Sequence, residues 1–124
     1  MGYVVESVGM LSGEMPYTAF YARKSYIDNN KDIINRFNRA INKGLDYVKT
    51  HDDEDVANII IDQFPDSSLN DVIKIVKRYR DNDSWLDNTS ISEDIYNNLE
   101  DIMIDNDLLD KYVDFDKLVI DLNE

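Results

Sequence analysis

The chain has 124 residues, the length of a single domain, and its formal net charge of −13 comes from 26 acidic and 13 basic residues. Nucleic acids and anionic membranes attract positive protein surfaces, so this charge argues against both as partners. A solvated helical surface explains the acidic residues, and an acidic mimic of nucleic acid is the alternative. The sequence has no cysteine, which excludes disulfides and thiolate metal sites, and no stretch approaches the roughly 18 apolar residues of a membrane span.

The first 22 residues have the pattern of two strands. Residues 3–8 (YVVESV) predict a buried strand, and residues 17–22 (YTAFYA) predict a second strand after a glycine-rich bend. A lone pair of strands is marginally stable in water, so we expect the rest of their sheet to come from another chain or from a further part of the protein. Unpaired strand edges pair readily with other chains, and we therefore expect a homo-oligomer formed through residues 1–25.

The chain after about residue 24 predicts helices. A short helix over residues 23–27 ends at an Asp-Asn-Asn sequence, and a long helix begins near Lys31. Gly44 lies inside this long helix, where glycine costs about 1 kcal/mol relative to alanine, so we expect a neighbour that packs closely against it. The long helix has one apolar stripe with helical spacing, made of Ile34, Phe37, Ile41, Leu45 and Val48.

Capping residues mark the next two predicted helices. Asp52 is the expected N-cap of a helix that starts at Asp53 and runs to about residue 63. Pro65 ends that helix because proline disfavours helical geometry in the residue before it. Ser68, with an acidic residue three positions later, opens the following helix. This helix carries the apolar residues Val72, Ile75, Val76 and Tyr79. Its far face holds a basic cluster of Lys74, Lys77, Arg78 and Arg80, for which we expect solvation or ion pairing.

The last predicted helix opens at a capping-box pattern formed by Ser90 and Glu93. After it, the tail of the chain is expected to dock as a short helix or an extended segment. Trp85 lies in the preceding connection, and we expect it to pack at a junction between helices. The apolar positions of this helix are Ile95, Leu99, Ile102 and Met103.

The sequence contains little that indicates catalysis. Its single histidine, His51, lies between two predicted helices, and without further ligands at metal-binding spacing a surface or capping role is favoured. Nucleophile-elbow, Walker and dinucleotide-binding motifs are absent. Asp105 and Asp107 match the start of a calcium loop whose glycine and closing glutamate are missing. We therefore expect no catalytic residues, no metal and no cofactor.

A succession of motifs runs along the chain. Residues 13–20 read GEMPYTAF, residues 24–27 read KSYI, and Ala40, Lys43 and Gly44 form an A-x-x-K-G helix core. Residues 64–85 (FPDSSLNDVIKIVKRYRDNDSW) and residues 91–109, which include LEDIMIDNDLL, complete the succession. In these motifs the chain resembles ABC-transporter substrate-binding proteins of the nitrate/sulfonate/taurine and thiamine-precursor group, which commonly show a G-E-x-P-Y-T-x-F pattern, a K-S-Y-I-type segment and similar C-terminal helices. The resemblance covers essentially the whole chain in collinear order.

The resemblance implies a longer, bilobed α/β parent fold of the periplasmic-binding-protein type II, of which this chain is a mostly α-helical part with two N-terminal strands. Residues 1–16 would form a strand and the crossing between lobes, and residues 17–124 the C-terminal part of the first lobe. Ser7, Ser12, Gly13, Glu14 and Tyr17 would face the ligand, with Gly9 and Gly13 as hinge residues. A simple turn at the two glycines is the alternative interpretation.

The function implied by the resemblance is that of the C-terminal portion of an importer's solute-binding component. Such a protein captures a small anionic or heterocyclic solute by lobe closure, delivers it to an ABC permease and acts outside the cytoplasm. The N-terminus lacks the basic and apolar regions of a signal peptide, so we expect any export signal to lie outside this sequence. A stand-alone acidic helical module that binds other proteins is the alternative. A third hypothesis, an enzyme of thiamine-pyrimidine synthesis with the same fold, is less favoured because the histidine-rich chemistry it needs is not visible in this sequence.

Overall fold

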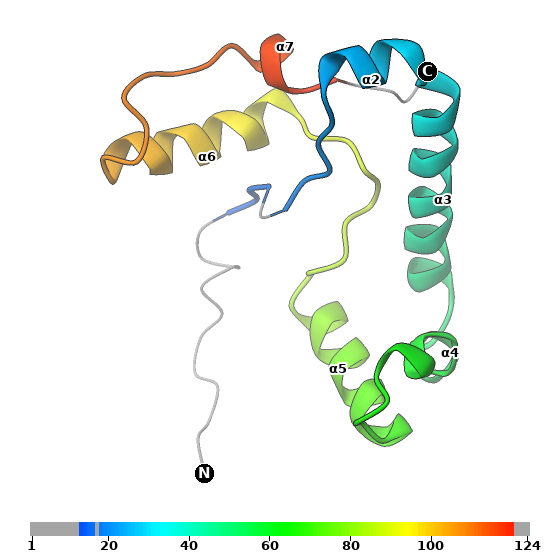
Figure 1. The fold of residues 1–124 in the computed structure, drawn as a ribbon. Coiled ribbons are helices and arrows are strands. Elements are labelled where there is room, and N and C mark those ends of the chain that lie inside the picture. The colour runs from blue at the N-terminus through cyan, green and yellow to red at the C-terminus, as the bar shows by residue number, and fades with distance from the viewer. Residues whose placement is uncertain (1–12, 17, 121–124) are drawn as a thin grey trace. The chain divides into compact units, whose positions relative to one another are not determined.

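The computed structural model describes residues 13–16 and 18–120, and these form helices joined by irregular segments (Figure 1). None of the helices in these ranges is long and apolar enough to cross a membrane. In chain order the helices are α2 (Lys24–Asn29), α3 (Lys31–Thr50), α4 (Asp53–Ile60) with the 3-10 turn η1 (Ile61–Gln63), α5 (Leu69–Asp81), α6 (Glu93–Asp105) and α7 (Phe115–Leu118).

The predicted α/β fold with two N-terminal strands is wrong, because the described part of the chain contains no strand. The second strand was predicted over residues 17–22, and its described residues, 18–22, are irregular; the predicted first strand (residues 3–8) lies outside the described residues. Phe20 and Tyr21 are 78% and 97% exposed. A segment with strand-forming residues forms a strand only when a neighbouring strand completes its hydrogen bonds, and no such neighbour lies within residues 13–16 and 18–120.

The chain divides into two compact units. The first unit combines the residues up to Arg36 with those from Ser90 onward, and the second unit is Phe37–Thr89. The predicted division at residue 16 falls beside residues that the structure does not describe, so it remains a prediction. The buried side chains of the second unit are apolar, whereas those in the described part of the first unit are Tyr96 and Glu100.

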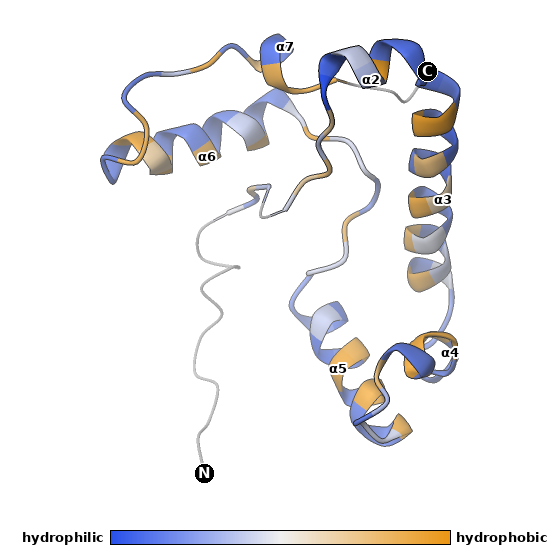
Figure 2. Ribbon diagram, in the orientation of Figure 1, coloured by the Kyte–Doolittle hydropathy of each residue, from blue (hydrophilic) through white to orange (hydrophobic). Residues whose placement is uncertain are grey.

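The second unit has an apolar core between α4 and α5. Val56, Val72 and Val76 are at most 2% exposed, and Ala57 is fully buried. Full burial of a valine side chain contributes about 1.5–3 kcal/mol, so these residues dominate the stability of the unit. The hydrophobic segments of both helices are visible in Figure 2. Partly buried side chains complete the core: Tyr47, Val48, Ile60, Ile61, Leu69 and Ile73.

The ends of α4 and α5 form as the sequence predicts. The carboxylate of Asp52 accepts a hydrogen bond from the backbone N–H of Asp55 at 2.8 Å, which satisfies a free donor in the first turn of α4. Ser68 accepts from the backbone N–H of Asp71 at 3.2 Å, and its hydroxyl donates to the Asp71 carboxylate at 2.7 Å. This carboxylate therefore has a lowered pKa, chiefly because of the hydrogen bond from Ser68. Helical structure stops at Gln63, before the proline.

Helix α3 begins at Lys31, as predicted, and its apolar stripe runs along one side of the helix (Figure 2). None of its residues is buried below the surface of the described chain. The close neighbour expected at Gly44 is not found, since no described atom outside the adjoining turns of the helix lies within 4 Å of the position that a Cβ would take there. The cost of glycine at this helical position is therefore not offset by close packing among the described residues.

Helix α6 organises the described part of the first unit. Its N-cap is Ser92, whose hydroxyl accepts from the backbone N–H of Ile95 at 3.3 Å, so the predicted capping box at Ser90 is wrong by two residues. After α6 the chain reverses and returns through an irregular segment to the short helix α7, which confirms that the tail docks with a helical turn. These two helices and the connection between them carry the site described next.

Candidate functional site

A buried carboxylate, Glu100, lies between α6 and the segment that precedes α7. Glu100 is 4% exposed, and Tyr96, one turn earlier on α6, is 7% exposed. The Oε1 atom of Glu100 accepts the Tyr96 hydroxyl at 3.0 Å and the backbone N–H of Val113 at 2.9 Å. Burying a carboxylate is costly unless donors satisfy it, and these two donors come from α6 and from the segment that precedes α7.

Tyr96 joins the same two elements. Its hydroxyl also lies 2.9 Å from the backbone carbonyl of Val113, so its one hydrogen is shared between this carbonyl and Glu100. The Phe115 ring meets the Tyr96 ring edge-on, with centroids 5.4 Å apart. Burial, followed by the hydrogen bond and the negative charge of Glu100, raises the pKa of Tyr96, which keeps the phenol protonated in its role as donor.

Two further contacts surround this buried group. The Tyr112 hydroxyl donates to Oδ1 of Asp101 at 2.7 Å, and this hydrogen bond raises the pKa of Tyr112. Asp114 forms an ion pair with Lys117, one turn later. The side chains of Tyr112 and Phe115 and the backbone of Val113 are thus in contact with α6.

An open pocket of about 420 Å³ lies between this face of α6 and the returning segment. Its residues on α6 recur with helical spacing and therefore share one face of the helix. Carboxylate and amide oxygens predominate in the lining, so the pocket can accept hydrogen bonds from N–H and O–H groups and repels anions. The residues 13–16 and 18–120 contain no group of three side chains suited to a metal ion. The pocket is lined by Glu93, Asn97, Glu100, Asp101, Tyr112, Val113, Asp114 and Phe115.

Of the site residues predicted from the sequence, two are described, and both lie beside α6. Gly13 has a φ of 75°, a conformation that favours glycine. The backbone carbonyl of Glu14 accepts from the Asn98 side-chain amide at 2.8 Å. Ligand contact at Gly13 and Glu14, a hinge at Gly13 and a simple turn at the two glycines all remain predictions. Ser7, Gly9, Ser12 and Tyr17 lie outside the described residues.

The sequence did not identify Glu100 as a central residue. The available signal was its position four residues after Tyr96, which places the two side chains on one helical face. The carboxylate also accepts a hydrogen bond from the backbone of Val113, which is 13 residues away. Nothing local to α6 in the sequence indicates that contact.

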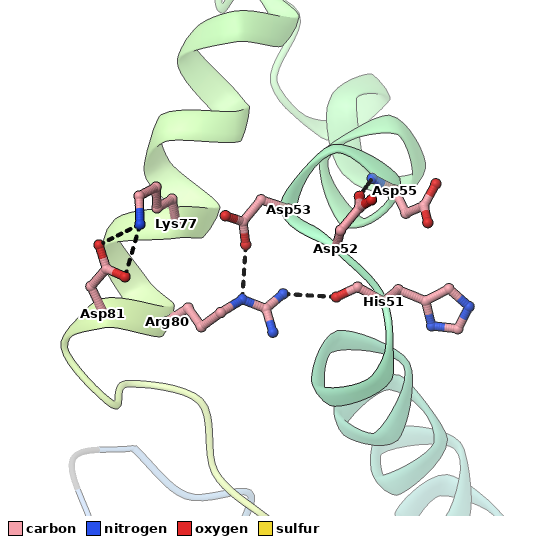
Figure 3. Close-up of polar contacts among 7 residues, drawn as sticks. All are labelled: His51, Asp52, Asp53, Asp55, Lys77, Arg80 and Asp81. Atoms are coloured by element: carbon pink, nitrogen blue, oxygen red, sulfur yellow. Dashed lines mark hydrogen bonds and ion pairs between the residues drawn. The ribbon is translucent and has the colours of Figure 1, made fainter.

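In the second unit, the basic cluster of α5 is used for ion pairs, one of the two expected outcomes. Arg80 donates to the Asp53 carboxylate at 2.8 Å and to the backbone carbonyl of His51 at 3.0 Å, and Lys77 pairs with Asp81 at 3.0 Å (Figure 3). The His51 ring stacks on Tyr47, with centroids 3.6 Å apart. These contacts join the end of α5 to the start of α4 and give His51 a structural position.

Trp85 packs against Tyr79 of α5, with ring centroids 5.6 Å apart, and lines a pocket together with Leu45 and Val48 of α3. Its indole Nε1 is buried and has no hydrogen-bond partner in the described part of the chain. Lys49 and Asp87 form an ion pair at 2.5 Å on the rim of a smaller pocket of about 170 Å³, and the hydrogen bond to Asp87 raises the pKa of Lys49. Cations and carboxylates are mixed in this pocket, so it selects weakly for ligand charge.

Comparison with known proteins finds a relative among bacterial proteins. The chain is similar to a protein of Bacillus subtilis (strain 168) named "Putative binding protein YtlA", with 32% identity over 119 residues. The alignment covers 96% of this chain and 36% of the relative, so the chain spans about a third of the length of the curated relative it matches. No family model matches the chain, and no solved structure matches it.

Proposed function

We propose that this chain is part of a solute-binding protein that delivers a small molecule to an ABC importer. The observation that carries the proposal is the alignment of 96% of the chain with a protein named as a binding protein. The motifs that resemble importer binding proteins point the same way. In this proposal the protein acts outside the cytoplasm, its protein partner is the permease, and it catalyses no reaction.

The chemistry of the first unit narrows the class of solute. Of the two classes that the resemblance implies, an anion is disfavoured in a pocket that presents Glu93, Asp101 and Asp114. A heterocycle with amino or ring N–H groups can donate to these carboxylates and to the Asn97 amide oxygen. The volume of about 420 Å³ falls in the range of small-molecule pockets. We therefore propose an amino-substituted heterocycle as the solute.

The test is calorimetric titration of the chain with cytosine, taurine and nitrate, which represent an amino-heterocycle, a sulfonate and an inorganic anion. We expect cytosine to bind and the two anions to give no heat of binding. Glu93→Gln keeps the side-chain size and removes one carboxylate from the pocket, so it should weaken cytosine binding by about tenfold, the strength of one charged hydrogen bond.

Glu54→Gln is the matched control, because Glu54 occupies the first turn of α4 as Glu93 occupies the first turn of α6. The control should bind cytosine as the unmodified chain does. Binding of taurine or nitrate in preference to cytosine would contradict the proposed solute class. Absence of binding by all three would contradict a solute site in this chain.

The second candidate function is an acidic helical module that binds another protein. It is favoured by apolar side chains exposed on the helices of the second unit: Ile59 is 62% exposed, Tyr79 49% and Ile75 42%. This candidate predicts self-association or complex formation that Ile59→Ser and Ile75→Ser weaken. Sedimentation of the chain as a monomer at all concentrations, together with binding of cytosine, would favour the solute-binding function.

A further inference from the structure

The segment between α6 and α7 reverses the direction of the chain at a single residue. Asp107 has a φ of 56°, a left-handed conformation that aspartate tolerates better than most residues. The reversal is closed by hydrogen bonds from the N–H of Asp107 to the Ile104 carbonyl at 3.0 Å and from the N–H of Leu108 to the Met103 carbonyl at 2.8 Å. Residues 107–115, named the strap below, begin at this turn.

The strap is attached to α6 mainly at its far end. Leu108, near the turn, is 70% exposed, and most of residues 107–112 are exposed with it. The contacts with α6 come from Tyr112, Val113 and Phe115. A segment with one fixed turn and one group of distant contacts can move about the turn when those contacts are lost.

The contacts at the far end depend on one side chain. Glu100 accepts the N–H of Val113, and Tyr96 is held between Glu100 and the Val113 carbonyl, so both polar groups of the Val113 backbone are bonded to the same pair of α6 residues. The Tyr112 hydrogen bond to Asp101 is exposed and is expected to contribute less. Removing the Glu100 carboxylate would leave the Val113 N–H without its acceptor.

We propose that the strap is a gate on the pocket of the first unit and that Glu100 is the residue that holds it closed. This inference rests on the proposed solute-binding function. One wall of the pocket belongs to α6 and the other to residues 112–115. A solute that touches both walls binds only the closed strap, so its apparent affinity falls in proportion to the fraction of molecules with the strap closed.

Amide hydrogen exchange at Val113, monitored by NMR in the absence of solute, tests whether Glu100 holds the strap closed. In Glu100→Ala we expect exchange at Val113 to accelerate by about tenfold or more, as for a lost hydrogen bond to a charged group, while amides in the middle of α6 keep their protection. Glu100→Gln should restore much of the protection, because its amide oxygen can accept the same donors. Tyr112→Phe, the matched strap variant, should change Val113 exchange little.

Two outcomes would overturn the proposal. Unchanged exchange at Val113 in Glu100→Ala would show that the carboxylate does not hold the strap. Equal acceleration at Val113 and throughout α6 would show that Glu100 stabilises the whole unit. Should Glu100→Ala fail to fold, Tyr96→Phe provides the second variant: it keeps the Glu100–Val113 bond, so it should accelerate Val113 exchange less than tenfold and still more than Tyr112→Phe.

Cytosine titration separates this proposal from the function on which it rests. If the unmodified chain does not bind cytosine and exchange at Val113 still accelerates in Glu100→Ala, the proposed solute is contradicted. The proposal that Glu100 holds the strap closed is then still supported. If cytosine binds Glu100→Ala as tightly as the unmodified chain while exchange at Val113 accelerates, the strap is not a gate. The proposed solute site is then still supported.

Discussion

The two units of the chain bury opposite kinds of side chain. In the second unit the buried residues are three valines and an alanine between α4 and α5, whereas in the described part of the first unit they are Tyr96 and the charged Glu100. Apolar burial is non-directional and tolerates small shifts, but a buried carboxylate requires donors at fixed positions. The second unit therefore has a core suited to stability, and the first has one suited to positioning a particular segment.

The largest loss of stability is expected from a substitution in the core of the second unit. Val76→Ala removes two methyl groups from a residue that is 1% exposed, so it should lower the free energy of unfolding by about 2–3 kcal/mol. Denaturant titration followed by circular dichroism measures this change. Ile59→Ala, on an exposed position of α4, should change it by less than about 0.5 kcal/mol. Equal effects of the two substitutions would contradict an apolar core at Val76.

The next largest loss of stability is expected from removing the contacts of Arg80 that link α5 to α4. Arg80→Gln removes the partly buried ion pair with Asp53 and the bond to the His51 carbonyl, and should destabilise the chain by about 1–2 kcal/mol. Lys77→Gln removes only an exposed ion pair and should cost about 0.5 kcal/mol or less. Thermal unfolding of both variants measures the two losses of stability. A loss in Arg80→Gln no larger than that in Lys77→Gln would contradict the structural role of Arg80.

Helix caps should have similar effects in the two units. Ser68→Ala and Ser92→Ala each remove a hydroxyl that accepts a first-turn N–H, and each should cost about 1 kcal/mol. Ser90→Ala, at the position that the sequence favoured, should cost less than Ser92→Ala. Urea denaturation measures all three, and a larger loss for Ser90→Ala would restore the capping box that the structure contradicts.

The smallest expected effect is the contribution of Tyr96 to the pH dependence of stability. Because the pKa of Tyr96 is raised in the folded chain, the unfolded chain loses this proton first as the pH rises above the ordinary value of 10.0. The contribution is present below that pH and is lost as the pH rises through the folded pKa, so stability falls in alkaline solution. Stability measured against pH should fall less in Tyr96→Phe. An identical alkaline loss in this variant would contradict the role of Tyr96.

Local features of the fold were predictable, and contacts between distant segments were not. Asp52 and Ser68 cap helices within three residues of themselves, so their roles could be read directly from the sequence. Residues 17–22 predict a strand from residue types alone, and residue types do not reveal whether a partner strand exists. Glu100 was missed because its burial depends on Val113, on a segment that the chain reaches only after reversing at Asp107.

Amide NMR spectra of the whole chain, recorded as cytosine is added, test the account most directly. We expect shifts at Asn97, Asp101 and residues 112–115 in the first unit, and no shift at Val56 or Val76 in the core of the second. Shifts centred on the second unit, or none at all up to millimolar cytosine, would contradict a solute site formed by α6 and the strap.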